Sequence, residues 1–139
     1  MTHIFDTNIA VEYGVEIAIV VNHLAFWIQK NEANGKHMHN GKVWTYNSIK
    51  AFSELFPYWT ERQIRRILMN MEELKIIETA NFNKVSYDRT KWYTFTDQFI
   101  NAHKPILQNG KMHFTESSNA YDQTVKSILP NGQMEVTKR

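Results

Sequence analysis

The stretch TERQIRRILMNMEEL, Thr60 to Leu74, decides the fold. Thr60 and Gln63 have the spacing of a capping box, in which each side chain accepts a hydrogen bond from the other residue's backbone N–H. Apolar residues then recur at helical spacing and predict one inward face, made of Ile64, Ile67, Leu68, Met71 and Leu74. The outward face carries three arginines in its first two turns, although a helix begins with the positive end of its macrodipole. An anionic partner would offset that unfavourable placement.

A second helix precedes this one and is joined to it by a tight turn. In YNSIKAFSELF, Asn47 or Ser48 is expected to cap the helix. Pro57 disfavours helical geometry at Phe56, so the helix ends there. Its inward residues are expected to be Ile49, Phe52 and Leu55 or Phe56.

A longer helix and a short hairpin are expected further upstream. Residues 15–30, VEIAIVVNHLAFWIQK, repeat apolar side chains on a wide helical face, which predicts a helix buried on most sides. Asn40-Gly41 is a strong hairpin signal, because both central positions of a type I′ turn have positive φ. The two strands of this hairpin would be residues 36–39 and 42–46.

Two β-rich runs follow the Thr60–Leu74 helix. KIIETANF and WYTFT lie on either side of the polar segment NKVSYDRTK, residues 83–91. Two strands around a basic tip, directly after a helix-turn-helix, describe a wing. Trp92 and Tyr93 alternate across the sheet, so we expect one of them in the core. The predicted fold class is therefore α+β: a winged helix-turn-helix of three helices and a β-hairpin wing, with a short extra hairpin.

Composition limits the class of protein. The 139 residues are 42% hydrophobic and 13% aromatic, which is enough for one domain with a real core. The absence of cysteine excludes a disulfide scaffold, a thiolate metal site and a cysteine nucleophile. The longest apolar run is too short and too interrupted for a membrane span, and we recognise no signal peptide. We expect a cytoplasmic protein without a membrane partner.

The basic excess is concentrated in the middle of the chain. Residues 36–96 carry ten basic and six acidic side chains, whereas residues 1–35 carry one basic and four acidic ones. The second helix of a helix-turn-helix enters the major groove, where arginine binds guanine or phosphate. We therefore predict double-stranded DNA as the partner. The candidate site is Arg62, Arg65, Arg66 and Met69 on the helix, Thr60 at its start, Lys50 on the preceding helix, and Lys84, Arg89 and Lys91 on the wing.

Parts of this site have a simpler interpretation as well. Glu61 and Arg65 at i,i+4 suit an ordinary solvated helix face. Asp88 beside Arg89 suits a turn cap, which would make the wing tip partly structural. Trp59 fits packing beneath the turn better than stacking on a base.

Other chemistry has little support. His37 and His39 alternate and could share a strand face, but no third ligand lies nearby in the sequence, so we expect no metal site. The sequence has no glycine-rich phosphate loop, no GxSxG and no spaced carboxylate pair. We therefore expect neither an enzyme nor a cofactor.

The chain changes character after residue 100. We predict a DNA-binding domain at residues 1–100 and a linker or tail at residues 101–139. In this tail ILQNGKMHFT (106–115) recurs as ILPNGQMEVT (128–137), with six of ten positions identical. The repeat is either a duplicated linear motif, which favours partner binding through effective concentration, or two arms that pair as a small sheet.

Several of these segments resemble a known family. WTYNS (44–48), FP (56–57), QIRR (63–66) and YDRTKWY (87–93) look like the N-terminal winged-helix domain of bacteriophage and prophage replication proteins. The resemblance covers roughly residues 15–96. It implies a replisome organiser or replication initiator that recognises origin DNA and recruits replisome components in the cytoplasm of a bacterial host.

The resemblance also implies partners. Family members are usually longer and carry a C-terminal part that engages the host replicative helicase or its loader, and many self-associate through the winged helix. Two rival functions stay open: a transcription regulator, which the same helix and wing would serve, and an oligomerisation or protein-interaction module.

Overall fold

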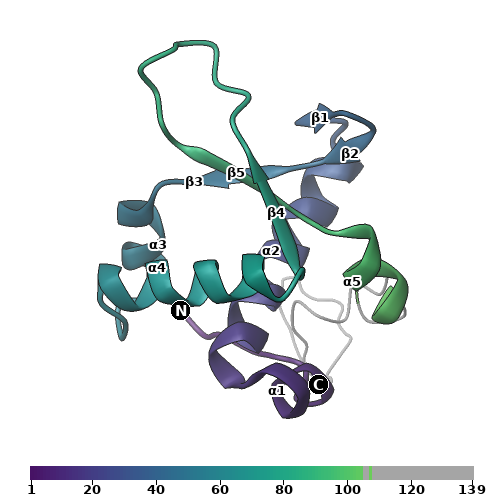
Figure 1. The fold of residues 1–139 in the computed structure, drawn as a ribbon, viewed down its shortest axis with the longest axis vertical. Coiled ribbons are helices and arrows are strands. Elements are labelled where there is room, and N and C mark those ends of the chain that lie inside the picture. The colour runs from purple at the N-terminus through teal and green to yellow at the C-terminus, as the bar shows by residue number, and fades with distance from the viewer. Residues whose placement is uncertain (105–106, 108–139) are drawn as a thin grey trace. The chain divides into compact units, whose positions relative to one another are not determined.

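The computed structural model describes residues 1–104 and 107, and this part of the chain is an α+β protein with five helices and two small antiparallel sheets (Figure 1). The described residues belong to two compact units, Met1–Phe26 with Leu107, and Trp27–Lys104. Within this part of the chain, no helix combines the length and the apolar character that crossing a bilayer requires.

The first unit begins with a helix that the sequence pattern did not reveal. The carboxylate of Asp6 accepts hydrogen bonds from the N–H groups of Asn8 (2.9 Å) and Ile9 (3.1 Å), which starts α1 (Thr7–Tyr13). Gly14, at φ 100°, ends it, and α2 (Val15–Ala33) follows at once. Seven residues with a single buried side chain, Ile9, are too few for a periodic apolar stripe. The expectation of three helices was therefore incomplete.

The predicted hairpin is present with shorter strands. β1 (Met38–His39) pairs antiparallel with β2 (Lys42–Val43). Asn40 and Gly41 connect them with φ of 54° and 76°, as a type I′ turn requires. The second strand does not continue to residue 46, because residues 45–47 form a separate strand, β3 (Thr45–Asn47), in the larger sheet.

The two central helices form as predicted. The Ser48 hydroxyl accepts a hydrogen bond from the Ala51 N–H and caps α3 (Ile49–Leu55). Thr60 opens α4 (Glu61–Glu73) with the complete capping box: the Gln63 N–H bonds Thr60 Oγ1 at 3.1 Å, and the Thr60 N–H bonds Gln63 Oε1 at 2.8 Å. The buried face of α4 is Ile64, Ile67, Leu68 and Met71.

Leu74 does not belong to that face, and its predicted burial is wrong. The side chain is 50% exposed. It is the C-cap residue of α4, and Lys75 beyond it adopts a positive φ of 63°. The chain thus leaves the helical path before the next inward position, and the following apolar pair, Ile76 and Ile77, is buried instead.

The larger sheet has the order β3-β5-β4. β5 (Lys91–Phe95) is central and antiparallel to both β3 and β4 (Ile77–Ala80). Residues 81–90, here called the β4–β5 loop, project beyond the sheet (Figure 1). Two helices joined by a short turn, followed by two antiparallel strands, therefore occupy residues 49–95.

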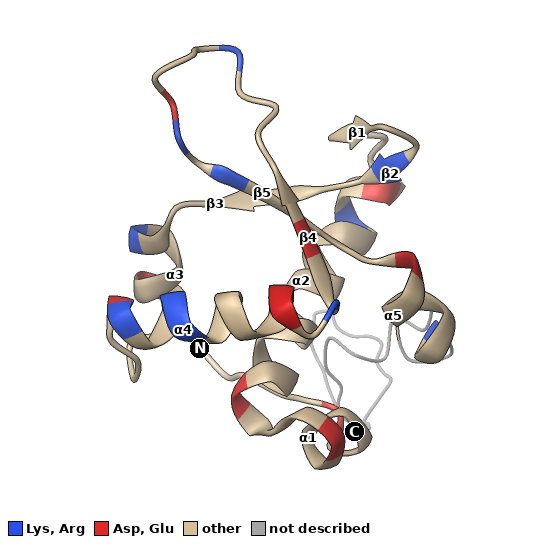
Figure 2. Ribbon diagram, viewed as in Figure 1, with Lys and Arg blue, Asp and Glu red and all other residues tan. Residues whose placement is uncertain are grey.

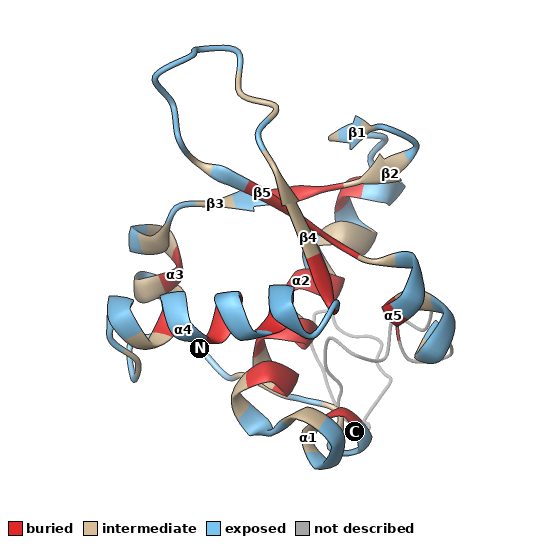
Figure 3. Cartoon of the chain, viewed as in Figure 1, coloured by how far each residue is buried: buried red, intermediate tan, exposed pale blue. Residues whose placement is uncertain are grey.

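Both Trp92 and Tyr93 are buried, with 7% and 2% exposed, although we expected only one of them in the core. The Tyr93 ring contacts Phe52 of α3 (5.6 Å between centroids). The opposite face of β5 is covered as well, because the Trp92 ring contacts His39 (5.3 Å) and Phe82 (5.7 Å). Figure 3 shows β5 as a mainly buried strand, whereas β4 beside it is mostly of intermediate burial.

A fifth helix, α5 (Asp97–Ala102), follows β5 and was also not predicted. The Thr96 hydroxyl accepts a hydrogen bond from the Phe99 N–H and donates one to the Lys75 carbonyl, which ties the start of α5 to the residue that follows the C-cap of α4. α5 runs across residue 100, where we placed the domain boundary, and that boundary stays a prediction. Apart from Leu107, the duplicated segments 106–115 and 128–137 lie outside the described residues.

Candidate nucleic-acid interface

A groove of about 490 Å³ lies between α4 and residues of β3, β4, β5 and the β4–β5 loop. It brings together four of the predicted DNA-binding residues: Arg65 and Met69 from α4, Arg89 from the β4–β5 loop, and Lys91 from β5. The other lining residues are Asn47, Ser48, Ile49, Leu68, Glu72, Thr79, Thr90 and Tyr93. Cationic side chains that are more than twenty residues apart in the sequence thus face one concave surface.

The α4 side of the site is exposed. Arg62, Arg65 and Arg66 are all exposed, and Met69 is 60% exposed. Figure 2 shows the basic positions in the first turns of α4, where Glu61 also lies, and the other two acidic positions, Glu72 and Glu73, near its end. The helix therefore presents its arginines at the end where the macrodipole is positive, as the sequence indicated.

Glu61 pairs with one of these arginines. Its Oε1 lies 3.5 Å from Arg65 Nη2 in the i,i+4 arrangement, with both side chains about half exposed. Such a pair contributes only about 0.3–0.5 kcal/mol. A guanidinium has five N–H donors, so this single contact leaves donors of Arg65 for the groove that it lines.

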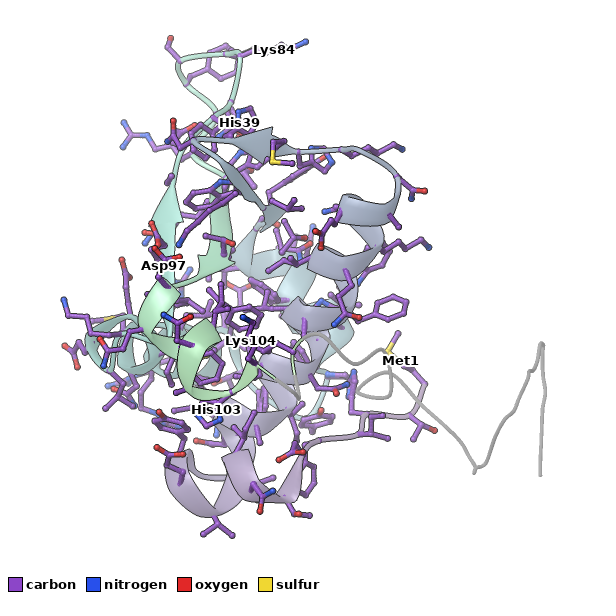
Figure 4. The ribbon with its side chains drawn as sticks, turned by 90° about the vertical axis from the view of Figure 1, so that its right-hand side faces the viewer. Met1, His39, Lys84, Asp97, His103 and Lys104 are labelled. Carbon is purple, nitrogen blue, oxygen red and sulfur yellow. The ribbon has the colours of Figure 1, made fainter. Side chains whose placement is uncertain are left out.

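The remaining predicted residues lie outside the groove. Lys50 is exposed on the first turn of α3. Lys84 lies at the outer end of the β4–β5 loop and points away from the rest of the chain (Figure 4). Thr60 has its hydroxyl and its N–H engaged in the capping box, so its role in the structure is to start α4. Trp59 is half-buried against Phe56, as expected for packing beneath the turn.

The β4–β5 loop is organised by one asparagine that the sequence reasoning missed. The Asn83 Nδ2 donates to the carbonyls of Asp88 (3.0 Å) and Thr90 (2.8 Å). Its Oδ1 accepts from the Trp92 Nε1–H at 2.7 Å, and its N–H bonds the side chain of Asn81 at 2.8 Å. These bonds fix both sides of the loop to the sheet. The only sequence signal was the preference of asparagine for turns.

Asp88 acts as the turn cap that the sequence suggested. Its Oδ1 accepts a hydrogen bond from the Thr90 N–H at 3.0 Å, and hydrogen bonding by Thr90 holds the pKa of this carboxyl below its usual value. Arg89 therefore lies in a loop whose shape is set locally, and it faces the groove.

The rings of His37 and His39 both contact the Trp92 ring, at 5.2 and 5.3 Å between centroids, although only His39 belongs to β1. His37 has a φ of 60° and precedes β1. Its ring contacts Trp92 and Tyr46, both at 5.2 Å, while the His39 ring stacks on Phe82 at 4.2 Å. Burial, followed by the charges of Lys36 and His39, lowers the pKa of His37. Among the described residues, no group of three potential ligands could hold a metal ion.

Comparison of the chain with known protein families, with curated protein sequences and with solved structures found no match.

Proposed function

We propose that this protein binds double-stranded DNA through a winged helix-turn-helix. In this proposal α3 and α4 are the two helices of the motif, and β4, β5 and the loop between them are the wing. The support is the order of the elements, the strand order β3-β5-β4, and the packing of α4 against β4. α4 would lie in the major groove, with its first turns on the base edges.

The shared groove is the observation that carries the proposal. Arg65 from the helix and Arg89 and Lys91 from the wing side line the same concave surface. A DNA backbone lying in it would meet cations from both walls, which is the arrangement expected for phosphate binding. The one acidic side chain of the groove, Glu72, already accepts a hydrogen bond from the Thr79 hydroxyl at 2.9 Å.

The candidate residues then have different roles. Arg62, Arg65, Arg66 and Met69 would face the bases and the adjacent phosphates, since they form the outward side of the first turns of α4. Arg89 and Lys91 would hold the phosphates in the groove. Lys84 at the loop end and Lys50 on α3 would add outer backbone contacts, and Thr60 would act through the cap.

The biological role that we propose is initiation of phage or prophage DNA replication in the cytoplasm of a bacterial host. The protein would mark the origin and recruit replisome components such as the host replicative helicase or its loader, and it would self-associate. Only the resemblance of residues 15–96 to the replication proteins supports this finer statement.

The experiment is a selection of binding sites from a pool of random duplexes, followed by a search for the selected sequence near the gene. Enrichment of one sequence that recurs within the replication region supports the proposal. Enrichment of a promoter site would indicate a transcription regulator instead. A pool that shows no enrichment over several rounds would contradict sequence-specific binding.

A further inference from the structure

β3 is an edge strand, and the backbone N–H and C=O of its central residue, Tyr46, point away from β5. Just beyond β5, the Thr96 N–H bonds the Ile76 carbonyl on the β4 side at 3.1 Å. Alternate residues of a strand direct their backbone groups to the same side, so Trp92 also bonds toward β4. Tyr46 lies opposite Trp92 in the register. It is therefore in a non-hydrogen-bonded pair, and its N–H and C=O point to the free edge of the sheet.

The hydrogen bonds of Trp44, two residues before Tyr46, independently indicate that the backbone groups of both residues point to this outer edge. Its N–H bonds the His37 carbonyl at 2.9 Å, and its carbonyl accepts a 2.9 Å hydrogen bond from the Asn31 side chain. Neither partner belongs to β5. The outward N–H and C=O of Trp44 thus have hydrogen-bond partners within the protein. At Tyr46 the same edge of β3 faces a groove.

This groove, here called the β3 groove, has a volume of about 510 Å³ and lies beside β3, between residues of α2 and α3. The volume is in the range of ligand-binding clefts, roughly 300–1,000 Å³. Trp27 and Leu55 supply apolar surface, and the Tyr46 side chain is 46% exposed. Its lining includes one carboxylate, Glu54, and no lysine or arginine.

The Glu54 carboxylate and the open edge of β3 at Tyr46 together favour one class of partner. A nucleic-acid backbone would bring phosphates to the Glu54 carboxylate without a cation among the lining residues to offset the repulsion. An extended peptide instead satisfies an open strand edge with its own N–H and C=O groups, while its alternate side chains fill adjacent surface.

We propose that the β3 groove binds an extended peptide segment of a partner protein, which adds as a strand beside Tyr46. A basic side chain of this peptide faces Glu54, and an apolar one packs against Trp27 and Leu55. The site is separate from the proposed DNA site, since Asn47 alone lines both grooves. The two sites are therefore separable by mutation.

The first test is selection of random octapeptides against the full chain, followed by synthesis of the enriched sequences. We expect peptides that combine a basic residue with an apolar one at alternate positions. Binding should protect the Tyr46 amide from hydrogen exchange and should weaken about tenfold in Glu54→Lys. The absence of enriched peptides, or binding that is equal in Glu54→Lys, would overturn the proposal.

A matched pair of variants tests the backbone contact itself. Tyr46→Ala keeps the N–H, whereas Tyr46→Pro removes it at an edge position whose N–H makes no bond within the sheet, where proline is tolerated. Both should keep the thermal midpoint within a few degrees of each other, while Tyr46→Pro binds the selected peptide about tenfold more weakly than Tyr46→Ala. Equal affinities in the two variants would contradict strand addition.

N-methylation of each backbone amide of the selected peptide in turn applies the same test from the partner's side. One methylated position should abolish binding, because the amide paired with Tyr46 can no longer donate. Tolerance at every position would overturn the proposal even if Tyr46→Pro fails to fold. Protection of the Tyr46 amide by a single-stranded dT decamer, but not by the peptides, would also overturn it and indicate nucleic acid in the β3 groove.

Discussion

The Trp92 Nε1–H donates a 2.7 Å hydrogen bond to Asn83 Oδ1, which joins the centre of the sheet to the base of the β4–β5 loop. Trp92 is 7% exposed, so this bond is partly shielded from solvent. Because the Asn83 amide group also donates to two carbonyls on the opposite side of the loop, one side chain holds both sides of the proposed wing.

Asn83→Ala should loosen this loop. The substitution leaves the Trp92 Nε1–H without its acceptor, which costs roughly 1–3 kcal/mol of unfolding free energy. Urea denaturation measures this loss, and hydrogen exchange at residues 84–90 should become faster. Ser86→Ala in the same exposed loop is the control and should change neither. Unchanged exchange in Asn83→Ala would mean that the loop is held by other contacts.

Arg65→Ala combined with Arg66→Ala should weaken binding to duplex DNA while leaving the fold intact, because both side chains are exposed. Each lost phosphate contact should reduce the magnitude of the log–log salt slope by about 1. The matched control is Lys36→Ala with Lys104→Ala, which removes the same charge from exposed positions that do not line the groove. Equal weakening by both pairs of substitutions would indicate a general charge effect. Unchanged binding in the arginine pair would contradict the proposal that α4 docks on DNA.

Lys42→Met should destabilise the second unit. Lys42 Nζ lies 2.8 Å from Glu78 Oε2 and 3.1 Å from Asp97 Oδ1, and it donates to the Phe95 carbonyl at 3.1 Å. Burial alone lowers the pKa of Lys42, but the bonds to Glu78 and Asp97 outweigh it and raise the pKa. We expect a loss of about 1 kcal/mol, measured by urea denaturation at pH 7.

The same network predicts a pH dependence of the Lys42 contribution. A raised pKa means that the stabilisation is complete below pH 10.5, the ordinary lysine value, and disappears as the pH rises through the higher value of the folded state. The difference in unfolding free energy between wild type and Lys42→Met should therefore shrink above pH 10.5 and stay constant between neutral pH and pH 10.5, where the carboxylates of Glu78 and Asp97 remain ionised. A difference that shrinks at neutral pH instead would contradict this origin.

His23 predicts an acid sensitivity in the first unit. Burial, with a smaller effect of His3, lowers the pKa of His23 from 6.5 to about 4. Because the folded state resists protonation, stability is complete above pH 6.5 and decreases as the pH falls toward 4. The thermal midpoint should decrease as the pH is lowered from 6.5 to 4. His23→Leu should make this decrease smaller, and it should do so more than the control His37→Gln. Parallel profiles for wild type and His23→Leu would contradict the assignment.

Residues whose partners are local were predictable from the sequence. Thr60 and Gln63 are three positions apart and form their box as expected, and Asn40-Gly41 makes its turn with the positive φ that these two residue types favour. α1 and α5 were missed because seven and six residues are too short for an apolar period. Asp6 and Thr96 cap them, but such caps are informative only when a longer stripe follows.

The site was less predictable than the fold, because its shape depends on long-range contacts. The residue types on α4 and the loop indicated cations, yet nothing in the spacing of Arg65 and Arg89 shows that they line one groove. Asn83 and Trp92 are nine positions apart and meet only because β5 returns beside β4. Leu74 continues the apolar stripe in sequence, and it is exposed because α4 has already ended.

The central claim is that the groove between α4 and the β4–β5 loop binds duplex DNA. The most direct measurement is a titration of the protein with duplex DNA at several salt concentrations, using random DNA and DNA from the neighbouring gene region. We predict a steep negative log–log salt slope, tighter binding to the local DNA, and a smaller slope in Arg65→Ala with Arg66→Ala. No binding at low salt would contradict the claim and would assign the α4 arginines to a protein interface.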